Sequence, residues 1–287
     1  MPMLLIKGHY EIVGTQPDGD TIHFQPDDPD EWDLIRGPRR VKRNAAGRGK
    51  LRMEAIDALE THYSQTGPEV HQPPPYANAA REELLDWVGF TDVVWGEDRK
   101  VASTEPASVP GFILTRGVDP SRRCIAFAGR GAAPAASGTQ VLVDIPMLQT
   151  TLNHHLIATG LVYPLYYRNL FPDLRNEVTA AVQQAQAAPA KGVWTVDKTL
   201  AGARVTGISS ITDSVVLFPK LFRRLVDYLN LGSPDLAGFP AYLDQEADRF
   251  VILSTGHFTT GLDEVVQVSG TTVKMTRPPT DLVFEED

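Results

Sequence analysis

Residues 51–60 read LRMEAIDALE, a β-prone segment that carries charged side chains inside an apolar run. Strand alternation places Arg52 and Glu54 on one face, and Asp57 and Glu60 follow where the strand is expected to end. The ordinary alternative is an edge strand whose charges face the solvent. The segment therefore predicts either a solvated strand edge or a group of functional charges at the end of a strand.

Two further segments carry charge where a folded core would not favour it. Residues 18–21 read DGDT, with two carboxylates across a glycine, and residues 122–127 read RRCIAF, an arginine pair leading into an apolar strand. Taken alone, the first is typical of a hairpin turn and the second of a strand end at the surface.

The three segments together hold the groups that phosphodiester hydrolysis requires. Two aspartates offer hard oxygen ligands for Ca²⁺ or Mg²⁺, and a glutamate can orient or deprotonate a water molecule. Two arginines match a phosphate and the extra negative charge of its transition state. Whether the three segments meet in space is left open at this point.

Five motifs then follow one another in order between residue 8 and about residue 185. They are D-G-D-T at 18–21, R-x4-D-x-x-E starting at Arg52, an arginine before C-I-A-F at 123–127, L-N-x-x-L at 152–156 and G-L-V-Y at 160–163. In motif order and rough spacing the chain resembles the staphylococcal nuclease (thermonuclease, SNase-like) family. The resemblance implies an α+β fold, an OB-fold five-stranded β-barrel with packed helices, over residues 1–190.

The resemblance also implies a role for each matching position. Asp20, Asp57 and the backbone carbonyl of Ala58 would bind Ca²⁺, with Mg²⁺ and Mn²⁺ as the alternative metals, and Asp18 would support these ligands. Glu60 would be the general base, while Arg52 and Arg123 would hold the scissile phosphate. Asn153 would fix a loop by hydrogen bonding. The residues expected at the site are Asp18, Asp20, Arg52, Asp57, Ala58, Glu60, Arg123 and Asn153.

A tyrosine is expected to line the nucleotide pocket of such a nuclease, and Tyr166 is the candidate here. The alternative is that Tyr163, Tyr166 and Tyr167 all pack at the edge of the barrel. The chain also departs from the family in two places. Leu59 replaces a proline between the aspartate and the glutamate, and no tyrosine stands directly before Arg123.

A basic strip, residues 36–52, contrasts with the rest of this acidic chain. The net charge is −9, yet the strip holds eight basic and no acidic residues, and the remaining 19 basic and 36 acidic residues give −17. The negative net charge argues against a nucleic-acid partner, but the distribution of charge along the chain favours one that binds beside Arg52. Part of the strip, about 36–50, is an insertion relative to the family, and its predicted phosphate-binding residues are Arg39, Arg40, Lys42 and Arg43. The alternative is a solvated face.

The chain as a whole has the composition of an ordinary globular protein. It has 287 residues, of which 42% are hydrophobic and 22% charged. No apolar run approaches the roughly 18 residues that a membrane span needs, and the first seven residues are too short for a signal peptide. The lone Cys124 excludes an internal disulfide. These features predict a cytoplasmic protein with no membrane partner.

The order of strand-like and helix-like segments predicts an α+β fold. Helices are expected over residues 77–88, at 148–157, from Asp173 and from Pro219 to Leu229, and the first strand over 9–13. A boundary is expected at 185–192, which leaves 191–287 as a smaller C-terminal α+β domain of unknown role. Its helix around 218–225 suggests either a core-facing helix or a surface for a protein partner or self-association.

We therefore expect a metal-dependent, Ca²⁺-type nuclease that cleaves DNA, with RNA as a second substrate, and the resemblance implies products ending in 3′-phosphate. Two alternatives stay open. One is a non-catalytic OB-type module that binds nucleic acid. The other is a nuclease subunit gated by a protein partner through the C-terminal domain.

Overall fold

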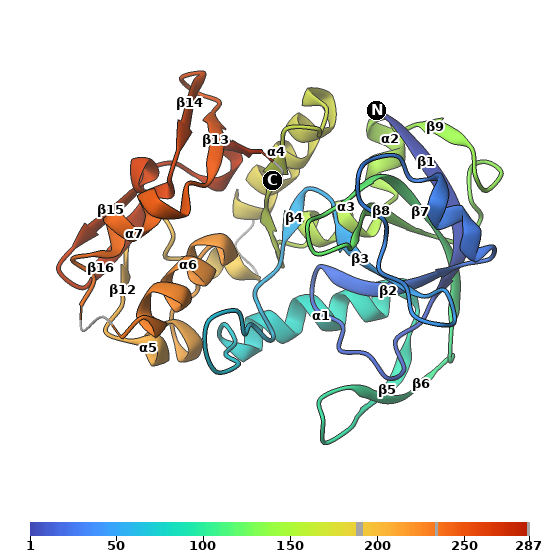
Figure 1. Ribbon diagram of the computed structural model, residues 1–287, viewed down its shortest axis with the longest axis horizontal. Coiled ribbons are helices and arrows are strands. Elements are labelled where there is room, and N and C mark those ends of the chain that lie inside the picture. The colour runs from blue at the N-terminus through green and yellow to red at the C-terminus, as the bar shows by residue number, and fades with distance from the viewer. Residues whose placement is uncertain (188–191, 233–234, 286–287) are drawn as a thin grey trace.

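Five strands of the chain close into a barrel in the order β1-β2-β3-β8-β7, with β7 returning to β1 (Figure 1). The structure is a computed structural model that describes residues 1–187, 192–232 and 235–285. β3 and β8 pair in parallel, and the other neighbours are antiparallel. The barrel strands are β1 (Pro2–Tyr10), β2 (Thr21–Pro26), β3 (Gly49–Met53), β7 (Val109–Val118) and β8 (Cys124–Arg130). The closed barrel with its helices is an α+β architecture consistent with an OB-fold.

Aromatic rings that lie over glycines fill the barrel interior. A side chain at Gly129 would stand 2.2 Å from the ring of Phe112, and one at Gly111 would stand 2.4 Å from the ring of Tyr10. The Tyr10 hydroxyl donates to the carbonyls of Phe112 and Gly129 at 2.9 Å each. Because a buried phenol needs such partners, these bonds hold the ring and the two facing strands together.

The N-terminal strand and the helix at 148–157 differ from the sequence expectations. β1 occupies Pro2–Tyr10 rather than 9–13, because it pairs along its length with β7. The expected single helix is two helices, α2 (Ile145–Gln149) and α3 (Leu152–Ala158). Thr151 separates them, since its side chain caps α3 by accepting from the amide of His154.

Helices and short strands complete the N-terminal part. α1 (Pro74–Val88) begins with proline in its first turn, and α4 (Pro172–Ala187) begins one residue before Asp173. No helix in the described ranges is long and apolar enough to cross a membrane. The remaining strands here are β4 (Ile56–Asp57), β5 (Thr91–Trp95), β6 (Val101–Glu105), β9 (Gln140–Leu142), β10 (Tyr163–Pro164) and β11 (Tyr166–Tyr167).

The C-terminal part lies against the side of the barrel that carries β4 and has two small sheets (Figure 1). β11 pairs in parallel with β17, the last strand of the chain, so the tail returns to the N-terminal part. The elements are α5 (Ile208–Asp213), α6 (Pro219–Asn230), α7 (Phe239–Glu246), β12 (Ala203–Arg204), β13 (Arg249–Ile252), β14 (His257–Thr260), β15 (Val266–Ser269), β16 (Thr272–Met275) and β17 (Leu282–Phe284).

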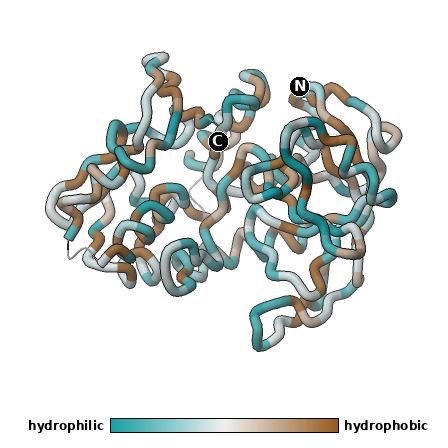
Figure 2. The backbone as a smooth tube through the Cα atoms, in the orientation of Figure 1, coloured by the Kyte–Doolittle hydropathy of each residue, from teal (hydrophilic) through white to brown (hydrophobic). Residues whose placement is uncertain are grey.

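Two apolar cores lie side by side, one inside the barrel and one under α6. The second core also takes Leu59, Ala77, Tyr163 and Leu165 from the N-terminal part. In Figure 2 the apolar segments, in brown, accordingly occur in both parts of the molecule. The predicted boundary at residue 190 lies outside the described residues, and the second core extends across it.

Candidate active site

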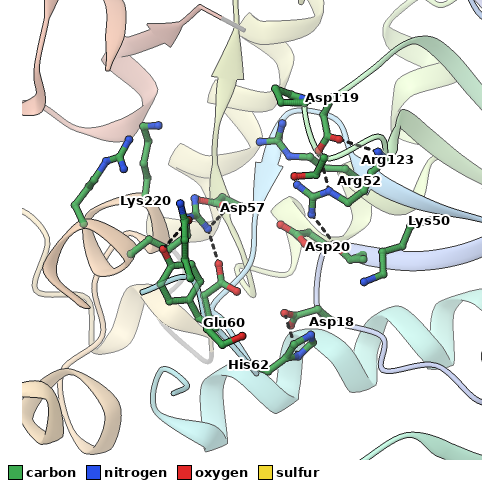
Figure 3. A pocket seen from close by; sticks show the side chains of 18 of the residues that line it. Asp18, Asp20, Lys50, Arg52, Asp57, Glu60, His62, Asp119, Arg123 and Lys220 are labelled. Carbon is green, nitrogen blue, oxygen red and sulfur yellow. Dashed lines mark hydrogen bonds and ion pairs between the residues drawn. The ribbon is translucent and has the colours of Figure 1, made fainter. Parts of the chain in front are cut away.

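Charged side chains from the barrel and from α6 line one cavity of about 710 Å³ (Figure 3). The cavity, called the cleft below, brings together all three charged segments of the sequence. Its charged and imidazole side chains are Asp18, Asp20, Lys50, Arg52, Asp57, Glu60, His62, Asp119, Arg123, Lys220, Arg223 and Arg224.

The register of the parallel strands explains why the two arginines meet. Leu51 of β3 is opposite Cys124 of β8, so Arg52 and Arg123 lie near the same end of this strand pair. On its other side β3 pairs with β2, where Arg52 is opposite Thr21. Strand pairing alone therefore assembles the phosphate-binding part predicted from the motifs.

The turn at residues 18–21 places two carboxylates at the start of β2. The amide of Asp18 donates to the carbonyl of Thr21 at 2.9 Å, and the carboxylate of Asp18 accepts from the amide of Gly19 at 2.8 Å. A side chain on Gly19 would stand 2.6 Å from the Cβ of Ala58, so this close approach requires glycine. Asp20 is thereby held beside Ala58, whose amide donates to Asp20 Oδ2 at 3.3 Å.

Asp57 ends the short strand β4 and Glu60 follows it, to the left of Asp20 in Figure 3. The main chain of Glu60 is fixed by the buried Gln72. The backbone amide of Gln72 donates to the Glu60 carbonyl at 2.8 Å, and the side-chain oxygen of Gln72 accepts from the backbone amide of Glu60 at 3.2 Å. The Gln72 side chain also donates to the carbonyl of Leu217, just before α6, at 2.8 Å. The loop that carries Glu60 is therefore tied to the C-terminal part.

Tyr167 lines the cleft together with Tyr63, and the prediction for Tyr166 is wrong in its placement. Tyr166 is fully buried, and its hydroxyl bonds to Thr179 at 2.8 Å. Tyr167 accepts from Arg52 Nη2 at 3.0 Å, and the Arg52 guanidinium lies 4.7 Å from its ring centroid. Neighbouring residues of a strand point to opposite faces, so a prediction that is wrong by one position selects a side chain in the core instead of one in the cleft.

Arg123, and not Arg122, points into the cleft. Its Nε donates to the buried carboxylate of Asp119 at 2.8 Å, and Asp119 also accepts from the Arg123 amide at 2.7 Å. Arg122 is exposed and donates to the carbonyl of Arg40 at 3.1 Å. Asp119 thus aims the second arginine at the cleft, a role that no sequence motif indicated.

Asn153 ties α3 to the barrel near the cleft. It is buried and accepts from the amide of Ala128 at 3.0 Å. Its side-chain amide donates to the carbonyls of Glu54 and Ala126 at 2.9 and 3.1 Å. All three bonds are to main-chain groups, so the side chain fixes the backbone that follows β3.

Arg223 of α6 reaches across from the C-terminal part and holds both Asp57 and Glu60. Its two terminal nitrogens donate to the two oxygens of Asp57 at 3.1 and 2.9 Å, and Nη1 also donates to Glu60 Oε1 at 2.6 Å. The side chains of Asp57 and Arg223 are 3% and 25% exposed, so this fork-to-carboxylate pair is largely desolvated. The sequence indicated no role for Arg223.

The predicted calcium ligands do not fit a resident metal in this arrangement. Both oxygens of Asp57 accept from Arg223, whose positive charge lies where a bound cation would lie. Asp20 Oδ2 accepts from the amide of Ala58. Among the residues that the structure describes, no group of three or more His, Cys, Asp or Glu side chains is suited to hold a metal ion. Ca²⁺ therefore stays a prediction.

Like charges lie close together in the cleft, and the pKa values of Glu60, Asp18 and Lys50 reflect it. Burial, with repulsion from Asp20 and against the attraction of Arg223, raises the pKa of Glu60 to about 7. Burial and the charges of Glu60 and Asp20 raise the pKa of Asp18 well above its usual range. Burial and the charge of Arg123 lower the pKa of Lys50. A cation in the cleft would relieve the repulsion among these carboxylates.

The basic strip adjoins the cleft on the side of Arg123. Lys42 and Arg43 line a second cavity of about 640 Å³, which shares Lys50 and Arg123 with the cleft. The amide of Lys42 donates to the Arg122 carbonyl at 2.9 Å, which ties the strip to the turn before β8.

The strip also contacts the protein itself. Arg40 donates to the carbonyl of Gly37 at 3.0 Å, and Arg43 pairs with Asp33 at 3.1 Å. Arg39 is half-buried, whereas Lys42 is exposed. The four predicted phosphate contacts are thus not equivalent, and Lys42 and Arg43 are the two that line the second cavity.

The histidines lie in separate places. His62 lines the cleft, with Nδ1 3.9 Å from Asp18. His154 contacts Glu177 at 3.1 Å and His155 contacts Glu83 at 2.6 Å. Adjacent helical residues diverge, which explains why the two rings meet different helices.

Comparison with known proteins assigns this chain to no family. No protein-family model matches it, and no curated protein matches it. The resemblance to the staphylococcal nuclease family therefore stays a prediction from the five motifs.

Proposed function

We propose that the chain is a nuclease that hydrolyses phosphodiester bonds in DNA, with RNA as a second substrate. The observation that carries the proposal is the convergence of Asp20, Arg52, Asp57, Glu60 and Arg123 around one cleft. A protein that only bound phosphates would need the arginines but not three carboxylates, which repel a phosphate. The five motifs and the barrel topology support the finer assignment, an SNase-like OB-fold.

The proposed chemistry uses the chain's own side chains. Arg52 and Arg123 hold the phosphate and stabilise the charge that builds on its oxygens. Glu60 accepts a proton from a water molecule, whose oxygen attacks phosphorus as the bond to the leaving oxygen breaks, and the leaving oxygen takes up a proton from solvent. Tyr167 and Asp119 orient the two arginines. By the resemblance, the product ends in 3′-phosphate.

Cleavage of a supercoiled plasmid, with Ca²⁺ or with a chelator, tests the proposal. We expect Glu60→Gln to reduce the cleavage rate by about 10²- to 10⁴-fold, the usual contribution of a general base. Glu83→Gln is the matched control, because Glu83 lies on α1 and pairs with His155. Cleavage that is equal in wild type and Glu60→Gln would remove the nuclease assignment.

The second candidate is a module that binds nucleic acid without cutting it. One observation favours it: Arg223 pairs with Asp57 and Glu60, the carboxylates that hydrolysis would use. Binding to a labelled oligonucleotide with no cleavage by any variant would support this alternative.

A further inference from the structure

The pair formed by Arg223 with Asp57 and Glu60 lies where the sequence predicts a metal ligand and a general base. Arg223 donates three hydrogen bonds to these two carboxylates. A guanidinium and a divalent cation satisfy a carboxylate in the same way, by placing positive charge against its oxygens. The same oxygen atoms of Asp57 cannot serve both at full strength.

α6 itself is anchored independently of Arg223. Asp227, one turn later on the helix, accepts from the Tyr63 hydroxyl at 2.7 Å and from the Thr66 hydroxyl at 2.6 Å. Lys220 pairs with Asp248 at 2.7 Å. These contacts do not involve Arg223, so a substitution at Arg223 leaves them intact.

The neighbouring Arg224 also pairs with two carboxylates, but it does not cross to the N-terminal part. Arg224 is directed to Asp248 and Glu246 in the C-terminal part. Arg223 instead crosses to the N-terminal part, and its partners stand beside the predicted metal ligand Asp20 in the same cleft.

We propose that Arg223 takes the place of a divalent metal in the cleft, as an internal cation that competes with such a metal for Asp57 and Glu60. The inference rests on the proposed function for the identity of the site, and it makes the C-terminal part a regulator of that site. With Arg223 in place, both the predicted ligand and the predicted base are occupied. Without Arg223, the carboxylates of Asp57, Glu60 and Asp20 would line the cleft with no guanidinium bound to Asp57 and Glu60.

The test is calcium affinity of the full chain, measured by titration calorimetry and by luminescence of Tb³⁺ as a calcium substitute. We expect Arg223→Gln to bind Ca²⁺ at least tenfold more tightly than wild type. Arg249→Gln is the control, because Arg249 on β13 pairs with Glu285 and does not line the cleft, and it should bind as wild type does. Adding Asp57→Asn to Arg223→Gln should abolish the gain.

Equal or weaker affinity in Arg223→Gln would overturn the proposal, because Arg223 would then be a structural contact or a support for the metal site. If Arg223→Gln does not fold, as judged by circular dichroism, Arg223→Lys replaces it. Lysine cannot make the two-pronged contact, so Ca²⁺ should bind more tightly than in wild type, and no gain would count against the proposal.

Plasmid cleavage by the same variants separates this inference from the proposed function. Tighter Ca²⁺ binding in Arg223→Gln with no cleavage by any variant would support the competition between Arg223 and metal and would contradict the nuclease function. Cleavage that depends on Glu60, with a Ca²⁺ affinity that does not change in Arg223→Gln, would support the nuclease function and would contradict the competition between Arg223 and metal.

Discussion

At the scale of single residues, the site depends on positions where the chain has no spare room. Gly19 stands between the two aspartates of the turn, and a Cβ there would lie 2.6 Å from Ala58 and 2.8 Å from Ala80. The turn can therefore bring Asp20 to the cleft only because residue 19 has no side chain.

We expect Gly19→Ala to lower the free energy of unfolding by about 1–3 kcal/mol, the usual cost of overpacking. Chemical denaturation followed by tryptophan fluorescence measures it. Gly117→Ala is the control, because a Cβ at Gly117 meets no atom within 4 Å. A similar effect of the two substitutions would show that the close approach at Gly19 is not limiting.

His23 should make folding stability depend on pH. Its Nδ1 is buried and has no hydrogen-bond partner among the described residues. Burial, with the charges of Lys50 and Arg48, lowers its pKa to about 4, against a usual value of about 6.5. Between these values the unfolded chain binds a proton that the folded chain does not, so stability falls as the pH falls.

The expected loss from this histidine is about 1–3 kcal/mol between pH 6.5 and pH 4. Urea denaturation at several pH values should show a flatter profile for His23→Gln than for wild type. His257→Gln, at an exposed position on β14, should keep the wild-type slope. An unchanged slope in His23→Gln would assign the acid sensitivity to other groups.

At the scale of elements, site residues that lie within one sequence motif were predictable. Site residues that come from distant segments of the chain were not. Asp57 and Glu60 follow Arg52 within eight residues, so their spacing is visible in the sequence. Arg223 lies more than 160 residues from Glu60, and its helix has an ordinary amphipathic pattern. Only the packing of α6 against the barrel brings them together. Tyr167 was missed because the sequence does not show which residue of the two-residue strand β11 faces the core and which faces the cleft.

The basic strip supplies the prediction at this scale. Neutralising Arg39, Arg40, Lys42 and Arg43 should weaken DNA binding and flatten its dependence on salt, since each lost phosphate contact lowers the slope by about one. The double change Lys42→Gln and Arg43→Gln should account for most of the effect, because these two line the cavity beside Arg123.

Fluorescence anisotropy of a labelled duplex, measured over a range of salt concentrations, gives both the affinity and the slope. Lys274→Gln, on the exposed side of β16, is the control and should leave both unchanged. Wild-type affinity with a wild-type slope in the fourfold variant would mean that the strip is a solvated face.

At the scale of the whole molecule, the chain behaves as two cores joined through one surface. Leu59, Tyr163 and Leu165 belong by sequence to the N-terminal part but pack in the core under α6. β17 closes the arrangement by pairing with β11. Asp57 and Glu60, which contact Arg223, therefore lie where the N-terminal part meets the C-terminal part. The proposed competition between Arg223 and a metal accordingly depends on the second core being folded.

A chain truncated at Ala187 is consequently expected to lose its cooperative fold. Each buried side chain of this size contributes about 1.5–3 kcal/mol, and whole domains are stable by only about 5–15 kcal/mol. Exposing Leu59, Tyr163 and Leu165 together should therefore remove much of the stability of the remaining barrel. Thermal unfolding followed by circular dichroism should show a broad transition at lower temperature. Phe258→Ala, an exposed apolar side chain in the full chain, is the control. A truncated chain that unfolds as sharply and at the same temperature as the full chain would instead establish residues 1–187 as an independent domain.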